Sequence, residues 1–196
     1  MDFRVAATGV MEPKLPLSAT DRAFHSNTMD YTAHYDSPLG SMTLASDGNV
    51  LLGLWFDGQK HFGNTIGTQA SLHVELTVFD AARRWLDAYF AGIRPQTMPL
   101  LMFRGTAFQQ HVWADLLSGP YGQTVTYGEL ARRIGCRSAQ AVGGAVGRNP
   151  ISIIVPCHRV VGTARANDDL PLRGYAAGLD RKEYLLRLER SRVLPI

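Results

Sequence analysis

The sequence predicts a protein of mixed helix and sheet (α/β, or more exactly described as α+β), built from two small domains. Three observations support this fold class. Residues 31–57 form short runs rich in Thr, Tyr, Val and Leu that alternate with turn sequences. A stretch with helical periodicity follows them, and a segment with two prolines, 93–100, then leads into a second half dominated by helical patterns. The chain has 196 residues, 45% of them hydrophobic, which is enough to bury a core in each domain.

The composition excludes several classes of protein. No run approaches eighteen consecutive apolar residues, and the first thirty residues lack the basic-then-apolar order of a secretory signal. We therefore expect no membrane partner and a cytoplasmic protein. Two cysteines, Cys136 and Cys157, are too few for a disulfide framework or a multi-thiolate zinc site.

Charge is divided unevenly between the two halves. Residues 1–99 carry seven Lys/Arg against ten Asp/Glu, a net charge of −3, whereas residues 100–196 carry thirteen against seven, a net charge of +6. Apart from Lys182, every Lys/Arg position in the second half is an arginine, whose flat cationic fork suits phosphate oxygens. A solvated charged face would explain the excess equally well, so it gives only modest support for a nucleic-acid partner.

The elements of the first half follow in order. Residues 1–29 have scattered charges and no clear period, which predicts a poorly ordered extension. Residues 30–99 then form the first domain. Its turn sequences SPLG and SDGN predict a β-meander with tight hairpins. The stretch 73–92 has apolar residues at helical spacing and ends at Gly92, which predicts an amphipathic helix packed on the sheet.

The second domain, 100–196, begins with three predicted helices. The first has Thr106 as a candidate N-cap and ends at Gly119. The second begins at Thr126, three residues before Glu129, which is the spacing of a capping box. A short turn leads to a third helix made of small residues, SAQAVGGAVGR, flanked by Arg137 and Arg148. This is the outline of a helix-turn-helix motif, although ordinary helical hairpins are commoner; the slim third helix favours close approach to nucleic acid.

A short apolar run, ISIIV at 151–155, predicts a buried strand that leads into Cys157-His158-Arg159. Neighbouring cations stabilise a thiolate, and the thiolate is the nucleophilic form of cysteine. The alternative is a cysteine that serves only as a small buried apolar residue, because adjacency in sequence does not place an imidazole on the sulfur.

The string PCHRVVG, preceded by NPISIIV, resembles the active-site signature of the O6-alkylguanine-DNA alkyltransferases, also called methylated-DNA-protein-cysteine methyltransferases. Further matching segments occur in the family's order: RGTAFQQHVW, PYGQTVTYGELA, AVGGAVGRNP and GYAAGLDRKEYLLRLE. The match covers the second half almost continuously and the first more loosely. The resemblance implies a ribonuclease-H-like sheet with a helix for 30–99 and a winged-helix-like, DNA-binding catalytic domain for 100–196.

The resemblance also implies a reaction. The alkyl group of O6-alkylguanine, and of O4-alkylthymine, would move irreversibly to the thiolate of Cys157, so that each molecule acts once and needs no cofactor. In the family, histidine, water and glutamate relay the thiol proton, and the matching residues are His158 and Glu189. Tyr127 matches the tyrosine that donates a proton or hydrogen bond to the leaving guanine.

Two further groups of residues follow from the same resemblance. Because the reactive carbon lies within the base stack, the nucleotide must be flipped into a pocket, with the small helix in the minor groove. The implied pocket residues are Asn149, Val155, Val160, Tyr175, Ala176 and Lys182. The implied DNA-binding residues are Arg137, Ala139, Gln140, Ala141, Gly143 and Arg159. The partner is double-stranded DNA containing alkylated guanine, with further copies of the protein beside it on DNA as an additional partner. The location is then the nucleoid, or the nucleus in a eukaryote.

The sequence departs from the family pattern at Gln140, considered below, and in the connection 163–173. The connection 163–173 is several residues longer than usual, which suggests a wider pocket rim that alters the range of alkyl groups accepted. Some members bind a structural zinc through two cysteines and two histidines of the first domain, but no cysteine precedes Cys136 here, so we expect no metal.

Two other classes of function compete with alkyl transfer. One is a lesion-recognition module similar to the alkyltransferase-like proteins, which bind the lesion without transferring the group; those proteins lack the cysteine that this chain has at Cys157. The other is a helix-turn-helix regulator, which explains the helices but leaves the PCHRVVG string without a purpose.

Gln140 provides the first test. The family usually has an arginine at this position, which intercalates where the flipped base was, and glutamine lacks both its charge and its flat stacking surface. We expect Gln140→Arg to raise the affinity for lesion-containing duplex DNA and the rate of alkyl transfer, both measured against the unchanged protein. Equal affinities and equal rates would contradict the hypothesis that Gln140 weakens base flipping. If Arg137→Gln lowers the affinity and the rate, Arg137 takes the part of the arginine that is missing at position 140.

Overall fold

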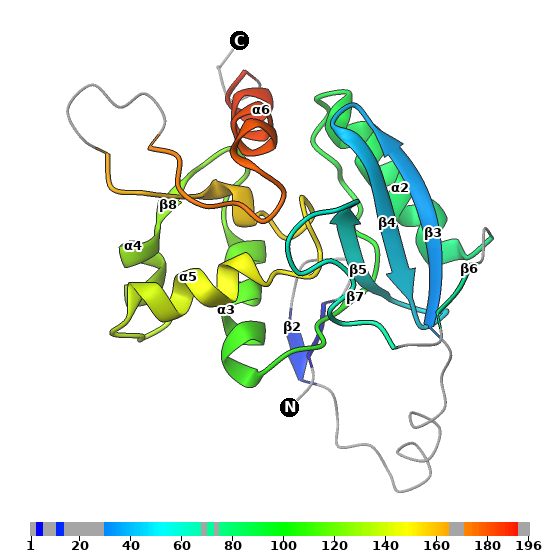
Figure 1. Ribbon diagram of the computed structural model, residues 1–196, viewed down its shortest axis with the longest axis horizontal. Helices are drawn as coiled ribbons and strands as arrows, with labels where there is room; N and C mark the ends of the chain where they lie inside the picture. Colours follow the sequence, from blue (N-terminus) through cyan, green and yellow to red (C-terminus); the bar gives the residue numbers. More distant parts are fainter. Residues whose placement is uncertain are drawn as a thin grey trace, which may run out of the picture.

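The computed structural model describes residues 30–67, 70–72, 75–164 and 171–191, and the backbone alone of 3–5 and 11–13. It confirms the mixed fold class. A sheet covered by one long helix forms one side of the molecule, and a group of shorter helices forms the other (Figure 1). Among the described residues, no helix combines the length and the apolar character needed to cross a membrane.

The N-terminal side is a mixed seven-stranded sheet with the strand order β2-β1-β7-β5-β4-β3-β6. Its strands are β1 (Phe3–Val5), β2 (Met11–Pro13), β3 (Asp30–Ser37), β4 (Gly40–Ser46), β5 (Leu51–Phe56), β6 (Ala70–Leu72) and β7 (Leu101–Met102). The antiparallel β3-β4-β5 meander confirms the prediction. The sheet is not wholly antiparallel, because β6 pairs in parallel with β3, and β7 in parallel with β5.

The two hairpin turns are built by the residues that predicted them. At the first, the Ser37 hydroxyl accepts a hydrogen bond from Leu39 N, and Gly40 has a φ of 110°. At the second, Asp47 Oδ1 accepts from Val50 N, and Gly48 has a φ of 101°. Short polar side chains bond the backbone of such turns, and glycine adopts positive φ without a steric penalty. The turn sequences therefore fix the register of the meander.

Two boundaries differ from the prediction. Residues 3–5 and 11–13 form β1 and β2, and β1 pairs with β7, so these parts of the expected extension are strands of the sheet. The other residues of 1–29 lie outside the described part of the chain. The strand β7 follows the proline segment and still belongs to the N-terminal sheet, because Leu101 pairs with Leu51. Short strands of two or three residues leave too little periodicity to be recognised in a sequence.

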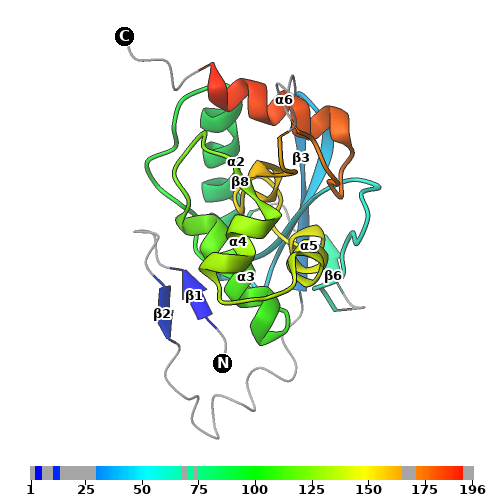
Figure 2. The same ribbon diagram turned by 90° about the vertical axis from the view of Figure 1, so that its left-hand side faces the viewer.

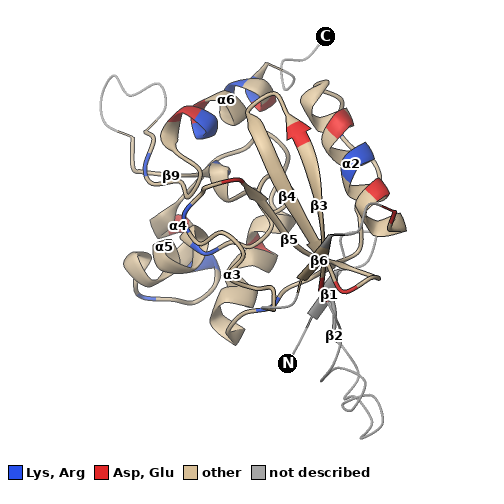
Figure 3. Ribbon diagram, turned by 45° about the vertical axis from the view of Figure 1, so that its right-hand side comes forward, with Lys and Arg blue, Asp and Glu red and all other residues tan. Residues whose placement is uncertain are grey.

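Helix α2 (Thr77–Phe90) packs on the sheet as predicted, and Gly92, with a φ of 72°, follows its end. Its buried face consists of Val78, Phe79, Ala82, Leu86 and Tyr89. Its outer face carries charges of both signs, and β3 carries an acidic residue near its end (Figure 3).

The C-terminal side contains helices α3 (Ala107–Ser118), α4 (Tyr127–Arg133), α5 (Ala139–Gly147) and α6 (Leu179–Arg190), the 3-10 turn η1 (Cys157–Arg159), and a two-stranded parallel sheet of β8 (Val125–Thr126) and β9 (Val160–Val161). Both predicted N-caps are confirmed, and each belongs to a capping box, Thr106 with Gln109 and Thr126 with Glu129. The pair α4 and α5 lies on one face of the molecule (Figure 2).

The strand expected at 151–155 is wrong. Ile151 makes a single bridge to Leu54 of β5, and the chain then turns through Ile153, whose φ is 68°. The Asn149 side chain explains the turn, since its amide donates to the carbonyl oxygens of Ile151 and Val155 while its oxygen accepts from Ile151 N. Buried backbone groups need partners, and here an asparagine supplies what a strand ladder would have supplied.

The two sides are packed tightly against each other. One apolar core includes buried residues of both. Polar contacts reinforce it: Arg104 pairs with Asp30 at 2.7 Å, and Arg181 donates to Leu39 O at 2.9 Å and lies over the ring of Phe56 at 4.8 Å. The seam between the domains is therefore a fixed surface on which a site can be built.

Gly53 in β5 tests this packing. A Cβ at Gly53 would lie 1.8 Å from the fully buried ring of Trp55. We expect Gly53→Ala to lower the free energy of unfolding by about 1–3 kcal/mol, because a filled core has no room for another carbon. Chemical denaturation followed by tryptophan fluorescence measures the change. The control is Gly128→Ala in α4, where a Cβ meets nothing within 4 Å and stability should stay equal or rise. Equal losses in both variants would contradict this explanation.

Candidate active site

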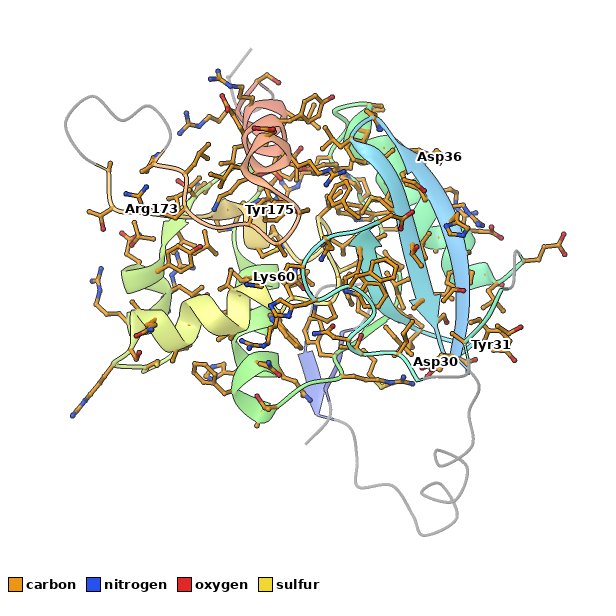
Figure 4. The ribbon with its side chains drawn as sticks, in the orientation of Figure 1. Asp30, Tyr31, Asp36, Lys60, Arg173 and Tyr175 are labelled. Carbon is orange, nitrogen blue, oxygen red and sulfur yellow. The ribbon has the colours of Figure 1, made fainter. Side chains whose placement is uncertain are left out.

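A cavity of about 370 Å³ lies at the seam between the two domains, and Cys157 is among its lining residues. The lining comes from four places: Lys60 and His61 of the N-terminal domain, Tyr127 of α4, the inner face and end of α5, and the loop from Gly174 to Ala176. Figure 4 shows Lys60 and Tyr175 near each other where the two sides of the molecule meet. The site is therefore built by both domains, although the sequence motifs that predicted it all lie in the second.

Cys157 opens the turn η1 and is 5% exposed. Its Sγ accepts a hydrogen bond from Asn149 Nδ2 at 3.0 Å, and the same amide nitrogen donates to Val155 O at 2.8 Å. Asn149 thus fixes both the turn that carries the cysteine and the sulfur atom itself. Asn149, expected to line the pocket, contacts the cysteine from within the protein and is not among the residues that line the cavity.

The charge state of Cys157 is set by opposing effects. Burial raises the pKa of the thiol, while the Asn149 hydrogen bond and the nearby Lys182 charge act against this rise. The resting group is therefore a thiol rather than a thiolate. A base is needed to take its proton before the sulfur can react as a nucleophile.

His158 and Glu189 form the buried pair that the resemblance implies. His158 Nε2 and Glu189 Oε1 are 2.8 Å apart, and both side chains are inaccessible to solvent. Burial lowers the pKa of His158 despite the pull of Glu189, so the imidazole is neutral at rest. Burial alone would raise the pKa of Glu189, but His158 and Arg159 outweigh it and hold that pKa at about 2. A neutral histidine held by a permanent carboxylate is suited to accept a proton through Nδ1.

The structure places Arg159 away from the DNA-binding role expected of it. Its Nε donates to Glu189 Oε2 at 2.8 Å, its Nη2 donates to Glu189 Oε1 at 3.1 Å, and its side chain is only 11% exposed. The ring of Tyr121 lies 5.2 Å from the guanidinium carbon. A buried carboxylate needs a paired charge, and Arg159 supplies it. Adjacency to Cys157 in sequence could not distinguish this role from a contact with phosphate.

Tyr89 is a member of the site that the sequence did not indicate. It lies on α2 of the N-terminal domain, is fully buried, and donates its hydroxyl to Glu189 Oε1 at 2.8 Å. Burial and the Glu189 charge raise its pKa well above the usual value, so it acts only as a donor. In the sequence it is one of several apolar positions on a helix face, and no local pattern marks its hydroxyl.

Lys182 also lies behind the cavity rather than in its lining. It is fully buried, and its Nζ donates to Val160 O at 2.6 Å and to the carbonyl oxygens of Arg173 and Gly174. Burial lowers its pKa to about 8, against the attraction of Cys157. Val155 and Val160, expected in the pocket, are buried in the core and do not line the cavity; the carbonyl oxygen of Val155 accepts from Asn149, and that of Val160 accepts from Lys182. Lys182 thereby ties the pocket loop to η1 and β9.

Tyr127, Tyr175 and Ala176 do line the cavity, as expected. Burial and the neighbouring Cys157 raise the pKa of Tyr127, so its hydroxyl keeps the proton that it could donate. Gly143 lines the cavity too, and a Cβ there would lie 3.6 Å from the Tyr127 ring. That distance is an ordinary van der Waals contact, so the packing of α5 on Tyr127 does not itself require a glycine at this position.

The other expected DNA-binding residues are exposed together on one end of the helix pair. Arg137 precedes α5, and Ala139, Gln140 and Ala141 form its first turn, all with exposed side chains. The opposite face of α5 is buried through Val142, Ala145 and Val146. The exposed end is free to meet a partner. Residues 165–170 of the long connection lie outside the described part of the chain.

A helix-turn-helix pair lies beside a cavity lined by a buried cysteine, and a buried histidine–glutamate pair follows that cysteine. This combination is typical of a DNA-binding protein with a reactive thiol. Two family models match the chain, the 6-O-methylguanine DNA methyltransferase ribonuclease-like domain over residues 31–99 and the DNA binding domain of the same methyltransferase over residues 107–191. The chain belongs to this family.

Relatives across bacteria and archaea share most of its length. It is 45% identical over 160 residues to a methylated-DNA-protein-cysteine methyltransferase of Mycobacterium leprae, covering 81% of this chain and 92% of that protein. The corresponding protein of Methanosarcina acetivorans is 46% identical, with 82% and 99% covered. The crystal structure of Mycobacterium tuberculosis OGT in complex with DNA is similar with a TM-score of 0.73 at 44% identity, covering 83% of this chain and 94% of that one.

Tyr89 can be tested by removing only its hydroxyl. In Tyr89→Phe, Glu189 Oε1 loses a donor and offers more negative charge to His158, which raises the pKa of the imidazole. A histidine that takes the thiol proton must first be deprotonated itself. If His158 has this role, the acidic limb of the pH profile for Cys157 alkylation should move up by about one unit. The rate of alkylation by iodoacetamide, followed by mass spectrometry across pH, measures this shift.

The matched control is Tyr35→Phe, which removes a hydroxyl bonded to Asp87 on the outer side of the same helix. We expect that variant to keep the profile of the unchanged protein. A merely structural role for Tyr89 would lower stability and leave the acidic limb in place, and that result would overturn its assignment as a positioning residue.

Proposed function

We propose that this protein repairs DNA by direct reversal of damage. It takes the alkyl group from O6 of guanine, and from O4 of thymine, in double-stranded DNA and transfers it to Sγ of Cys157. The observation that carries this proposal is the buried His158–Glu189 pair next to a cysteine that lines a cavity at the helix-turn-helix side of the molecule. Membership of the methyltransferase family and the likeness to OGT bound to DNA support it.

The first step makes the nucleophile. Glu189 holds His158 through Nε2, which leaves Nδ1 to accept the thiol proton of Cys157 through the water of the family relay. Asn149 Nδ2 and the Lys182 charge stabilise the thiolate that results. The surrounding low-polarity interior leaves the sulfur poorly solvated, and therefore reactive toward a soft carbon centre.

The second step is a displacement at carbon. The thiolate lone pair forms the S–C bond as the C–O6 bond breaks, and the electron pair of that bond stays on O6. Tyr127 lies in the same cavity with its proton retained, and it donates to the leaving base. The products are S-alkylcysteine and unmodified guanine. The thioether does not revert, so each molecule acts once.

The DNA must present the base to this cavity. The reactive carbon is out of reach within a duplex, so the nucleotide flips out, and the small first turn of α5 enters the minor groove to support the opened stack. Gln140 is placed on that turn. Such a protein works where the chromosome is, so we place it in the cytoplasm with the nucleoid, or in the nucleus of a eukaryote. Neighbouring copies on DNA remain a further proposed partner, and neither a cofactor nor a metal is required.

One experiment tests the transfer directly. The protein is incubated with a duplex oligonucleotide that contains one O6-methylguanine, and peptide mass spectrometry then follows the peptide with Cys157. We expect a gain of one methyl group per molecule, with no turnover beyond one equivalent of DNA. Cys157→Ala should abolish the gain, whereas Cys136→Ala, which removes the other cysteine of the chain, should not.

The opposite outcome is equally informative. If the peptide stays unmodified while the lesion duplex still binds more tightly than an undamaged duplex, the protein is a recognition module and the transfer proposal is wrong.

A further inference from the structure

Three basic side chains gather at the cavity without a counter-charge. Lys60 and His61 come from the loop between β5 and β6, and Arg148 follows the end of α5; all three line the cavity that contains Cys157. None of the lining residues is Asp or Glu. Within the described chain neither Lys60 nor Arg148 forms an ion pair, and Arg148 Nη1 reaches only Gly144 O of its own helix.

The loop that carries two of these groups is held against the C-terminal domain. Gln59 Oε1 accepts hydrogen bonds from Phe56 N at 3.0 Å and from Ser152 Oγ at 3.1 Å. Lys60 N donates to Ala176 O of the pocket loop at 3.0 Å. His61 has a φ of 63°, a left-handed conformation that non-glycine residues adopt at an energetic cost. The fold therefore fixes these basic groups at the cavity.

Their closeness is electrostatically unfavourable without an anion. Burial, the Arg148 charge and the Lys60 charge all lower the pKa of His61, which shows that the three groups act on one another. The proposed transfer does not use them: guanine is neutral, and Cys157, His158, Glu189 and Tyr127 supply the nucleophile, base and acid. An anion bound between Lys60 and Arg148 would relieve the repulsion.

We propose that Lys60 and Arg148, assisted by His61, bind a backbone phosphate of the lesion-bearing strand next to the flipped nucleotide, so that the N-terminal domain contacts DNA directly. When a nucleotide enters the cavity, its flanking phosphates pass over the mouth, where the basic groups lie. This inference rests on the proposed function in one respect, that the ligand of the cavity is a nucleotide of DNA. A carboxylate at the end of a longer O6 substituent shares the same anionic chemistry and is distinguished below.

The test measures binding of the full-length protein to an O6-methylguanine duplex at several salt concentrations, using Cys157→Ala so that no transfer occurs. We expect Lys60→Gln to weaken binding by about threefold to tenfold, and to reduce the slope of log affinity against log salt by about one. Lys60→Arg should restore both. Arg94→Gln, which removes an exposed charge of the N-terminal domain outside the cavity, should change neither.

Neutral phosphates identify the contact. A series of duplexes is made, each with one uncharged methylphosphonate at a different position flanking the lesion. Replacing the contacted phosphate should weaken binding to the protein that retains Lys60. At one position, Lys60→Gln should cause no further loss, because both changes remove the same contact. Full additivity at every flanking position, or an unchanged affinity and salt slope in Lys60→Gln, would overturn the proposal.

A further binding measurement distinguishes a backbone phosphate from a carboxylate on the O6 substituent. If Lys60→Gln binds the O6-methylguanine duplex normally and loses affinity only for an O6-carboxymethylguanine duplex, the anion is the substituent and the phosphate assignment is wrong. These outcomes are independent of alkyl transfer: an unmodified Cys157 peptide in the unchanged protein refutes the proposed reaction, and it leaves the binding comparison intact.

Discussion

The buried carboxylate of Glu189 holds the site together. A carboxylate that is inaccessible to solvent is tolerated only when it is paired and hydrogen-bonded, and this one takes donors from His158, Arg159 and Tyr89. These donors come from η1 and from α2, while Glu189 lies on α6. The hydrogen bonds to this one carboxylate therefore hold the ring of His158, the chain that follows Cys157, and helix α2 of the N-terminal domain in fixed positions around Glu189.

Asn149 has the corresponding role for the sulfur. It replaces a strand ladder with side-chain hydrogen bonds, which lets the chain turn sharply and present Cys157 at the cavity. The same amide nitrogen that shapes the turn also touches Sγ. One side chain therefore both shapes the turn and contacts the sulfur. Burial raises the pKa of the thiol and lowers that of His158, so both groups are neutral at rest.

The N-terminal domain contributes more than a scaffold. Leu54 of its sheet forms a β-bridge with Ile151, and Tyr89 of its helix α2 donates a hydrogen bond to Glu189. Lys60, in its loop after β5, lines the cavity. The first half of the sequence has a net negative charge, and α2 carries charges of both signs (Figure 3), yet the loop after β5 brings Lys60 and His61 to the cavity. The net charge of each half of the sequence therefore does not reveal the basic groups that the N-terminal domain offers for the proposed contact with DNA.

Features that depend on neighbours along the chain could be predicted without the structure. The capping boxes at Thr106 and Thr126, the turns at Gly40 and Gly48 and the small helix α5 follow from local backbone chemistry, and the cysteine motif marked the nucleophile directly. The partners of the site residues, in contrast, became visible only in the folded protein. Arg159 pairs with Glu189, and Tyr89 and Lys60 reach the site from the other domain. Contacts between residues distant in sequence arise from packing and leave no pattern in the sequence itself.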